Sequence, residues 1–217
     1  MYWTRRAPAQ TADGEVELPV RIESLTGSAL RGVLDEVARL RIAVFREWPY
    51  LYDGTLGYER HYLADFAEAE DAVIVAARDG DTVVGAATAA PLTGHTKEFV
   101  PLFAAQGLDP DRIFYFGESV LLAAYRGHGL GHAFFDHREA HARAGAGPSG
   151  PYTHTAFCAV VRSEEDVRRP AGYRPLDAFW SKRGYQKVDG LIGSYRWKEV
   201  DTTEETDKPM QFWMKAL

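Results

Sequence analysis

Hydrophobic and polar positions in the first half of the chain follow periods that separate strands from helices. Residues 16–22 alternate apolar and polar side chains, which predicts a strand, and Pro19 favours a place at the edge of a sheet. From Leu30 onward, apolar residues recur at helical spacing. The elements predicted up to residue 87 are a strand over 16–22, helices over 30–44 and 56–69, and a hairpin of strands over 72–78 and 81–87.

The second half is organised around one strongly apolar segment. Residues 112–122 are apolar on both faces apart from Glu118, which predicts a central strand covered on both sides. A glycine-rich loop follows this strand and opens a helix over 131–144. The remaining predicted elements are a short inserted helix over 99–107, a strand over 153–161, a short helix over 176–183, and closing strands over 191–200 and 210–217.

This order of elements predicts an α/β (α+β) fold with a single domain. The sheet is expected to be mixed and largely antiparallel, with about six or seven strands and with helices on both faces. Residues 1–15 are small and polar without periodicity, so we expect a flexible lead-in. The domain should therefore span residues 16–217, and a chain of 217 residues has one domain by default.

The net charge and the cysteine content narrow the functional classes. A formal charge of −6 disfavours a general nucleic-acid binder, because phosphate neutralisation requires a basic face. Cys158 is the only cysteine, which excludes an intramolecular disulfide and a cysteine-based zinc cage. No apolar run approaches the roughly 20 residues that span a bilayer, and the N-terminal residues lack the apolar core of a signal peptide. We therefore expect a cytoplasmic protein that binds neither nucleic acid nor membrane.

The loop between the central strand and its helix carries the clearest chemical signal, Arg126-Gly127-His128-Gly129-Leu130-Gly131. Glycine permits a positive φ and has no Cβ, so successive backbone N–H groups can converge on an anion. The helix N-terminus adds partial positive charge. The dinucleotide fingerprint fails because His132 stands where its third glycine would be, and the Gly-Lys-Ser/Thr of a Walker loop is absent. A pyrophosphate site is favoured over a helix start that is glycine-rich for packing alone.

These residues resemble the signature of the GNAT superfamily of acyl-CoA-dependent N-acyltransferases. Arg126, Gly129 and Gly131 match the three fixed positions of its central loop, and the order of elements resembles the family throughout the predicted domain. Residues 179–185 and 212–217 resemble its late helix with the following turn and its last strand. The resemblance implies an N-acetyltransferase that moves an acetyl group directly from acetyl-CoA to an amine.

The resemblance also implies which residues hold acetyl-CoA. The pyrophosphate would lie on the backbone N–H groups of the loop, with the Arg126 side chain adding charge. The pantetheine arm and the thioester carbonyl would bind the backbone of a strand that splays just after Glu118. The implied cofactor-binding residues are Val120, Leu121, Leu122, Arg126, Gly127, His128, Gly129, Leu130, Gly131 and His132.

Glu118 is the candidate general base. It is the only charged side chain inside the central strand, on the face expected to carry Phe116 and Val120. Burial disfavours a charged carboxylate and so favours proton acceptance from an ammonium nucleophile. In some GNAT members a glutamate at the corresponding place is the base. The alternative is a structural carboxylate that pairs with an arginine or receives backbone N–H groups.

The resemblance also implies a general acid that protonates the leaving thiolate, and two positions of this sequence are relevant to it. Trp180 stands where the family often has the tyrosine proposed to protonate the leaving thiolate. The asparagine usually found near the start of that helix is also absent, and Tyr173 lies close to its place. Tyr173 is therefore the second candidate catalytic residue.

The acceptor is open at this stage. Aromatic residues crowd the junction of the first two helices, a region that walls the acceptor pocket in the family, and they either bind an aromatic or cationic acceptor or form ordinary core. They are Trp48, Tyr50, Tyr52, Tyr58 and Tyr62. We expect a small-molecule or peptide amine and leave homodimer formation open. The alternatives are a non-catalytic acyl-CoA-binding or regulatory module, and an enzyme that uses a longer acyl group.

A metal site is not expected. His137 and His141 stand one helical turn apart with Glu139 between them, but the spacing is not His-Glu-x-x-His. We interpret them as partly buried histidines with satisfied hydrogen bonds, and Cys158 as a buried thiol rather than a nucleophile. Elemental analysis of protein purified without a metal-affinity tag should find no stoichiometric metal. One tightly held zinc per chain, lost in His137→Ala, would contradict this prediction.

Overall fold

The computed structural model describes residues 9–10, 16–17 and 20–217. Ala9–Gln10 (β1) pairs antiparallel with Val16–Glu17 (β2). The rest of the expected lead-in over 1–15, together with residues 18–19, lies outside the described residues.

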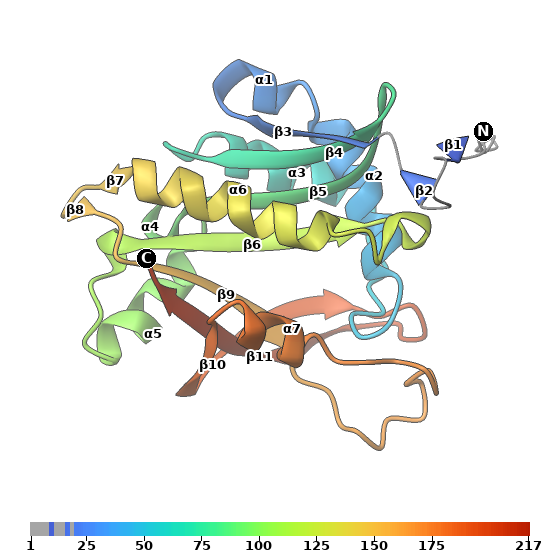
Figure 1. The fold of residues 1–217 in the computed structure, drawn as a ribbon. Helices are drawn as coiled ribbons and strands as arrows, with labels where there is room; N and C mark the ends of the chain where they lie inside the picture. The colour runs from blue at the N-terminus through green and yellow to red at the C-terminus, as the bar shows by residue number, and fades with distance from the viewer. Residues whose placement is uncertain (1–8, 11–15, 18–19) are drawn as a thin grey trace.

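Seven strands form one mixed sheet in the order β10-β11-β9-β6-β5-β4-β3 (Figure 1). Neighbouring strands are antiparallel except β6 and β9, which are parallel. This confirms the predicted mixed, largely antiparallel sheet. The strands are β3 (Val20–Leu25), β4 (Val73–Asp79), β5 (Thr82–Pro91), β6 (Ile113–Leu121), β9 (His154–Val160), β10 (Gln186–Lys198) and β11 (Glu205–Ala216), with a separate small pair of β7 (Ala146–Gly147) and β8 (Gly150–Pro151).

Helices lie on both faces of this sheet (Figure 1). Helices α2 (Leu34–Phe45) and α3 (Leu56–Ala67) cover one face, and α6 (Leu130–Ala144) covers the other. The shorter helical elements are α1 (Gly27–Arg31), α4 (Leu92–His95), η1 (Lys97–Phe99), α5 (Val100–Ala105), η2 (Pro110–Arg112), η3 (Ala123–Tyr125) and α7 (Asp177–Lys182). Within the described ranges, no helix has the length and apolar character needed to cross a membrane.

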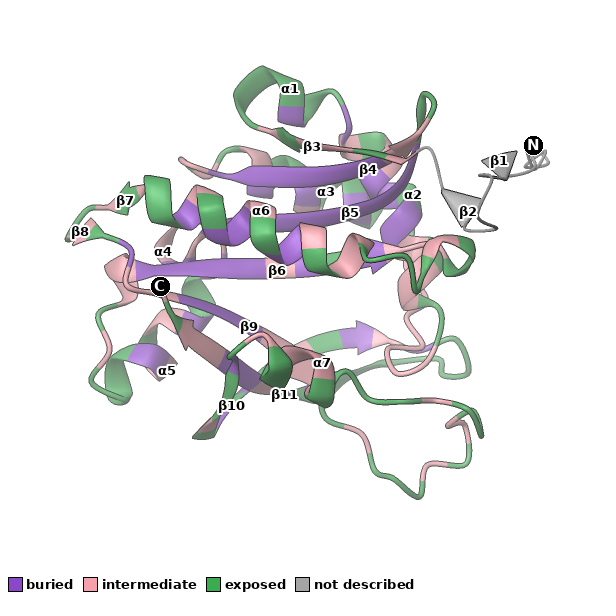
Figure 2. Ribbon diagram, in the orientation of Figure 1, coloured by how far each residue is buried: buried purple, intermediate pink, exposed green. Residues whose placement is uncertain are grey.

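The central strands are buried on both faces (Figure 2). Ile74 and Val75 are consecutive in β4 and are both fully buried, because Ile74 packs on the α2–α3 side and Val75 packs on the side of α6. Continuous apolar runs in strands arise from this double cover. It explains why β4, β5 and β6 lack the alternation seen in β3.

The C-terminal half of the sheet has its own cover. Phe99 and Phe103, at and after η1, lie edge-on to Phe212 of β11, with ring centroids 4.9 and 5.0 Å apart. On the other face, Trp180 of α7 packs against Trp213 at 5.2 Å. The segment predicted as an inserted helix therefore closes this half of the core.

The closing hairpin is longer than the sequence predicts. Residues 201–208 were expected to connect two strands, but β11 already begins at Glu205. Thr206 and Asp207 pair with Trp197 and Arg196 of β10, at an end of the hairpin where polar side chains stay in solvent. Backbone pairing compensates there for the missing apolar pattern.

Candidate active site

Strands β6 and β9 separate part-way along their length (Figure 1). They pair in parallel only through residues 113–115 and 154–156. Beyond that point β6 stays bonded to β5 and β9 stays bonded to β11, so the two strands form a fork. The edge of β6 that faces the fork begins at Phe116, three residues earlier than the splay expected just after Glu118.

A β-bulge sets the direction of the side chains at the fork. Thr88 of β5 stands opposite both Gly117 and Glu118, because the register shifts between Ala87 and Ala89. A Cβ at Gly117 would lie 2.4 Å from the Thr88 hydroxyl oxygen, so this close approach requires glycine. The same hydroxyl accepts a hydrogen bond from the Glu118 N–H at 3.2 Å.

The bulge corrects one expectation about Glu118. Phe116 packs on the side of α6, whereas Glu118 pairs with α2 and Val120 packs in the core beneath α2 and α3. Glu118 therefore shares its face with Val120 but not with Phe116. The extra residue reverses the alternation of side chains between positions 116 and 118.

The bulge also decides which backbone groups point into the fork. The Leu122 N–H donates to the Val84 carbonyl at 3.0 Å, and Val120 is paired with Ala86. Because antiparallel strands alternate inward and outward groups, the N–H groups of Ser119 and Leu121 are directed away from β5. Of the predicted backbone group Val120, Leu121 and Leu122, only Leu121 has its N–H directed into the fork, and Ser119 joins it there.

Glu118 is held by a buried arginine. The Arg41 Nη1 of α2 lies 2.5 Å from Glu118 Oε2, and its Nε donates to Glu59 of α3. Burial opposes the charge on Arg41, but the carboxylates of Glu118 and Glu59 raise its pKa well above the ordinary value. Among the described residues, the Oε1 atoms of Glu118 and Glu59 are buried without a hydrogen-bond partner. Arg41, Glu59 and Glu118 form a buried triad with a formal charge of −1, and two of its carboxylate oxygens accept no hydrogen bond from the described residues.

Neutral rings surround this triad. The Arg41 guanidinium lies 4.3 Å from the ring centroid of Tyr62 and 5.2 Å from that of Phe45. Burial and the nearby Glu118 raise the pKa of Tyr62. Burial lowers the pKa of His95, whose ring lies 4.9 Å from Tyr62. At neutral pH these rings contribute no charge that would offset the triad.

The predicted aromatic group is only partly gathered at the site. Tyr62 lies over Arg41, and Tyr50 contacts Phe45 at 4.6 Å. Tyr58 is 57% exposed, so it points to solvent rather than toward Glu118. The sequence could not separate these positions, because helical spacing near a turn does not give the direction of each ring.

Arg138 of α6 forms hydrogen bonds to the bulge from the face of the sheet opposite to Arg41. Its guanidinium donates to four uncharged acceptors: the carbonyls of Phe134, Thr88 and Glu118, and the Ser119 hydroxyl oxygen. The side chain is 1% exposed and lies 4.2 Å from the Phe116 ring centroid. Burial lowers the pKa of Arg138 to about 10, so the group remains a cation at neutral pH. A buried positive charge thus lies directly behind the fork.

The glycine loop has the predicted geometry. Gly127 and Gly129 adopt φ values of 85° and 79°, a region that side chains with a Cβ rarely enter, and α6 begins at Leu130. Within the described part of the chain, the N–H groups of residues 127–131 donate no hydrogen bond. They surround the N-terminus of α6 and remain available to an anion.

The Arg126 side chain is already engaged. It donates to the Leu121 carbonyl at 3.0 Å and pairs with Glu47 at 2.9 Å, and both charged groups are about half exposed. Its charge is therefore largely offset. The backbone N–H groups carry more of the expected anion affinity than this side chain does.

Tyr173 and Trp180 lie in different surroundings. Tyr173 sits in the loop before α7, edge-on to Trp48 at 6.1 Å, and burial and the neighbouring Asp177 raise its pKa. Trp180 packs against Phe157 at 5.1 Å as well as against Trp213. The indole at the position of the family tyrosine is thus a packing residue.

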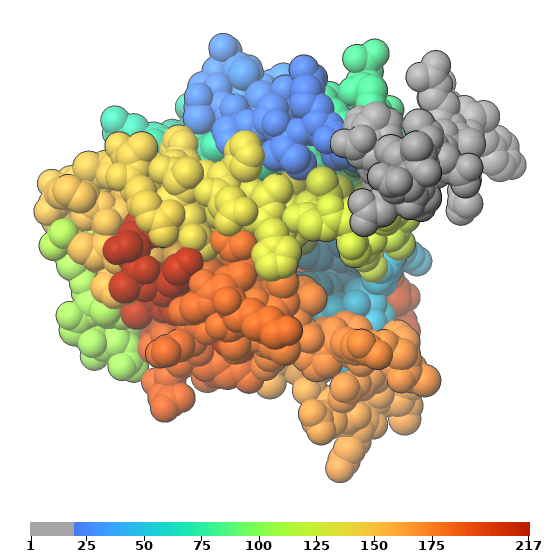
Figure 3. All heavy atoms as spheres, in the orientation of Figure 1, coloured from blue at the N-terminus to red at the C-terminus, as the bar shows by residue number. Residues whose placement is uncertain are grey.

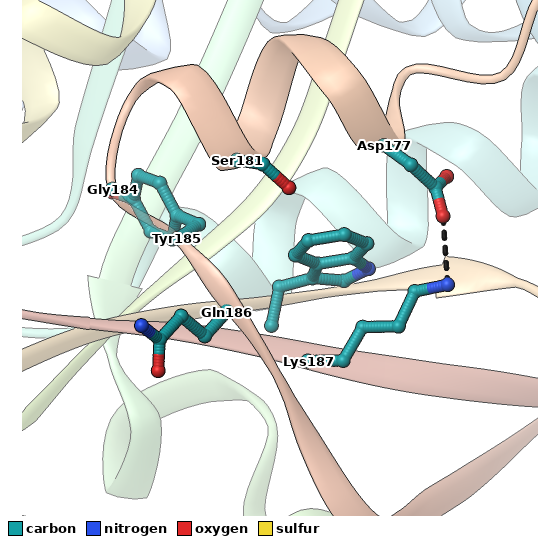
Figure 4. Close-up of a pocket in the computed structure, with 7 residues that line it drawn as sticks. Asp177, Ser181, Gly184, Tyr185, Gln186 and Lys187 are labelled. Carbon is teal, nitrogen blue, oxygen red and sulfur yellow. Dashed lines mark ion pairs between the residues drawn. The ribbon is translucent and has the colours of Figure 1, made fainter.

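A separate hollow of about 490 Å³ lies beside α7 (Figure 4). Lys187 pairs there with Asp177 at 2.7 Å and lies 5.2 Å from the Trp213 ring. The lining residues are Asp177, Ser181, Gly184, Tyr185, Gln186, Lys187 and Trp213. None of the predicted site residues lines this hollow.

The paired histidines have the predicted surroundings, whereas the cysteine is more exposed than predicted. His137 Nδ1 lies 2.8 Å from the Ser24 hydroxyl, and His141 Nε2 lies 2.8 Å from Asp71. Both are partly buried with separate partners, which confirms our interpretation of their hydrogen bonds. In residues 20–217 no cluster of three or more His, Cys, Asp or Glu could hold a metal. Cys158 is only partly buried, where a buried thiol was expected, and its Sγ lies 3.0 Å from the Tyr115 hydroxyl. The low-dielectric surroundings raise the pKa of this thiol to about 12.

Three charged residues of the site escaped sequence reasoning, although each left the same signal. Each lies four residues from a buried apolar residue and therefore on the same face of its helix. The pairs are Arg41 with Val37, Glu59 with Leu63, and Arg138 with Phe134. A charge on the buried stripe of a helix requires a partner. That rule marks these positions, but it does not name the partner.

Comparison with known proteins gives a consistent answer at the level of fold. The sequence matches no protein-family model and no curated protein. An Arabidopsis thaliana NAA60 structure in complex with acetyl-CoA covers 91% of this chain and 98% of its own, at 12% identity and a TM-score of 0.56. The chain has the fold of GNAT-family acetyltransferases.

Two bacterial structures agree with this assignment of the fold. A ribosomal-protein-alanine N-acetyltransferase from Brucella melitensis is similar over 91% of this chain and 99% of its own, at 14% identity and a TM-score of 0.52. A GNAT-family acetyltransferase from Streptococcus pneumoniae covers the same shares at 12% identity and a TM-score of 0.50. The first turn of α6 and the helix α7 lie side by side on one face (Figure 3), with the His132 and Phe179 ring centroids 4.8 Å apart.

The buried triad yields a prediction about stability. Arg41→Met should destabilise the protein by about 3–5 kcal/mol at pH 7, because two buried carboxylates lose their partner. Urea unfolding measures this loss, with the exposed Arg39→Met as the matched control. A loss no larger than that of Arg39→Met would show that the buried ion pairs do not hold the site together.

Proposed function

We propose that this chain is an N-acetyltransferase that moves an acetyl group from acetyl-CoA to an amine. The observation that carries the proposal is two sets of free backbone donors, which we together call the row. Ser119 and Leu121 supply the first set at the fork, and residues 127–131 supply the second at the start of α6. Glu118 precedes Ser119 in β6, and the loop directly precedes α6 (Figure 1).

The chemistry of CoA fits this row. The pyrophosphate would lie on the glycine loop, where positive φ values and the missing Cβ atoms leave the backbone accessible. The pantetheine arm would extend β6 along the free N–H groups of Ser119 and Leu121, in the manner of an added strand. The bound thioester supplies the activated acetyl group.

Glu118 would act as the proton acceptor. Its Oε2 is held by Arg41, which fixes the orientation of the carboxylate. Its Oε1 has no partner among the described residues, so it can accept a hydrogen bond from an ammonium group. The acceptor amine would then lose its proton next to the thioester end of the row.

Tyr173 would act as the proton donor. Its hydroxyl carries a proton at neutral pH, as a general acid must, and the raised pKa makes it a weaker acid than an exposed tyrosine. The acceptor would be a small molecule or a peptide. A protein of similar fold supports an amine acceptor, since it is a ribosomal-protein-alanine N-acetyltransferase.

One observation favours the non-catalytic alternative. Glu118 already forms an ion pair with Arg41, which is the structural role considered for this carboxylate. A protein with this fold that binds acyl-CoA without turnover would need no free base. We favour catalysis because the second oxygen of Glu118 is buried and accepts no hydrogen bond from the described residues.

The cofactor site can be tested by calorimetry. Gly129→Asp should weaken CoA binding severely, because it places a side chain and a negative charge at the anion site. Gly107→Asp is a matched control, since Gly107 has a similar φ of 74° outside the loop and nothing within 4 Å of an added Cβ. Equal CoA affinity in the wild type and Gly129→Asp would refute the cofactor site.

The general base can be tested by steady-state kinetics. Glu118→Gln should keep CoA affinity but lower kcat and kcat/KM by roughly 10²- to 10⁴-fold, because the amide cannot accept the proton. High pH should restore part of the rate, since more acceptor amine is then neutral. Glu68→Gln, at an exposed ion pair, is the control. Near-normal turnover with lowered thermal stability would instead make Glu118 a structural carboxylate.

A further inference from the structure

Ser119 differs from the other residues of the fork in its side chain. It is exposed at the position where β6 has left β9, and its hydroxyl oxygen lies 2.8 Å from Arg138 Nη2. A guanidinium has donors only, so the Ser119 oxygen must be the acceptor in this bond. The hydroxyl proton is therefore free for another acceptor, and within residues 20–217 no side chain or carbonyl takes it.

Arg138 is a buried cation that has no charged hydrogen-bond partner among the described residues. It is almost fully buried, yet all its hydrogen bonds end on neutral oxygens, and two of these are the carbonyls of Thr88 and Glu118 at the bulge. Burying a cation with neutral partners alone is costly. We infer that this free-energy cost is tolerated because the guanidinium holds the bulge in place and polarises the Ser119 hydroxyl.

We propose that the Ser119 hydroxyl, oriented and polarised by Arg138, donates a hydrogen bond to the thioester carbonyl of the bound acyl carrier. Ser119 would then be a catalytic residue and Arg138 a positioning residue. The hydroxyl joins the N–H groups of Ser119 and Leu121, so three donors lie along the edge of β6 at the fork. This inference rests on the proposed function, because it requires an acyl thioester in the fork.

The arrangement suits a group that gains negative charge. Hydrogen-bond donors that are fixed before the reaction stabilise developing charge more than donors that must reorient. A hydroxyl that already accepts a bond from a cation is a stronger donor than a free hydroxyl. The effect should therefore be larger on turnover than on binding.

The first test needs binding alone. Calorimetry on Ser119→Ala should show the affinity for acetyl-CoA lowered about fivefold relative to that for CoA, which lacks the carbonyl. Ser119→Thr keeps a hydroxyl and should restore the ratio. Ser194→Ala, at an exposed serine of β10 outside the fork, should leave the ratio unchanged. An unchanged ratio in Ser119→Ala would overturn the proposal.

The second test follows turnover and addresses Arg138. Ser119→Ala should lower kcat roughly tenfold or more, with KM for acetyl-CoA changed less. Arg138→Lys keeps the charge but cannot reach the four acceptors at once, so it should lower kcat and the binding ratio as Ser119→Ala does. The double variant should be no worse than Arg138→Lys alone, because both changes remove one interaction.

The outcomes separate this inference from the proposed function. A wild type that fails to bind CoA would refute both. Normal binding and turnover in Ser119→Ala would refute the inference and leave the proposed function intact. Arg138→Lys with lowered thermal stability but an unchanged binding ratio would limit Arg138 to a structural role and overturn its part in the proposal.

Discussion

The bulge in β6 is the constraint on which the candidate site depends. One extra residue opposite Thr88 directs Glu118 toward α2, while Ser119 and Leu121 turn their N–H groups away from β5. Without that residue the alternation would continue from Phe116, and the carboxylate would face α6. Gly117 makes the close contact with Thr88 possible. One extra residue in β6 therefore places the Glu118 carboxylate on the α2 side and the free N–H groups at the edge of the strand.

Two buried arginines hold this bulge from opposite faces of the sheet. Arg41 binds the Glu118 side chain from α2, and Arg138 binds the Glu118 carbonyl from α6. Their partners differ in kind, since Arg41 pairs with carboxylates and Arg138 donates to neutral oxygens. Both interactions are made in a dry interior, where an unmatched polar group is expensive. Because of that cost, shifts of β6 that separate these partners are strongly disfavoured.

The site therefore combines a rigid part and an accessible part. The triad around Glu118 is enclosed by rings and is almost removed from solvent. The glycine loop and Ser119 are exposed. A long ligand bound along this row would reach from solvent to the buried carboxylate. Such a gradient of burial suits a reaction in which a proton leaves an amine beside an activated carbonyl.

The sequence by itself determined the order of the strands and helices, the central place of residues 112–122, the glycine loop and the candidate Glu118. Periods of apolar residues and glycine positions are local properties, so the chain displays them directly. Only the tertiary structure decided the partners of Glu118, the face that it occupies, and the choice of Ser119 and Leu121 as donors. These follow from the register of β6 against β5 and from contacts between residues as distant as Arg41 and Glu118. A bulge changes register without changing composition, and a buried charge shows that a partner exists without naming it.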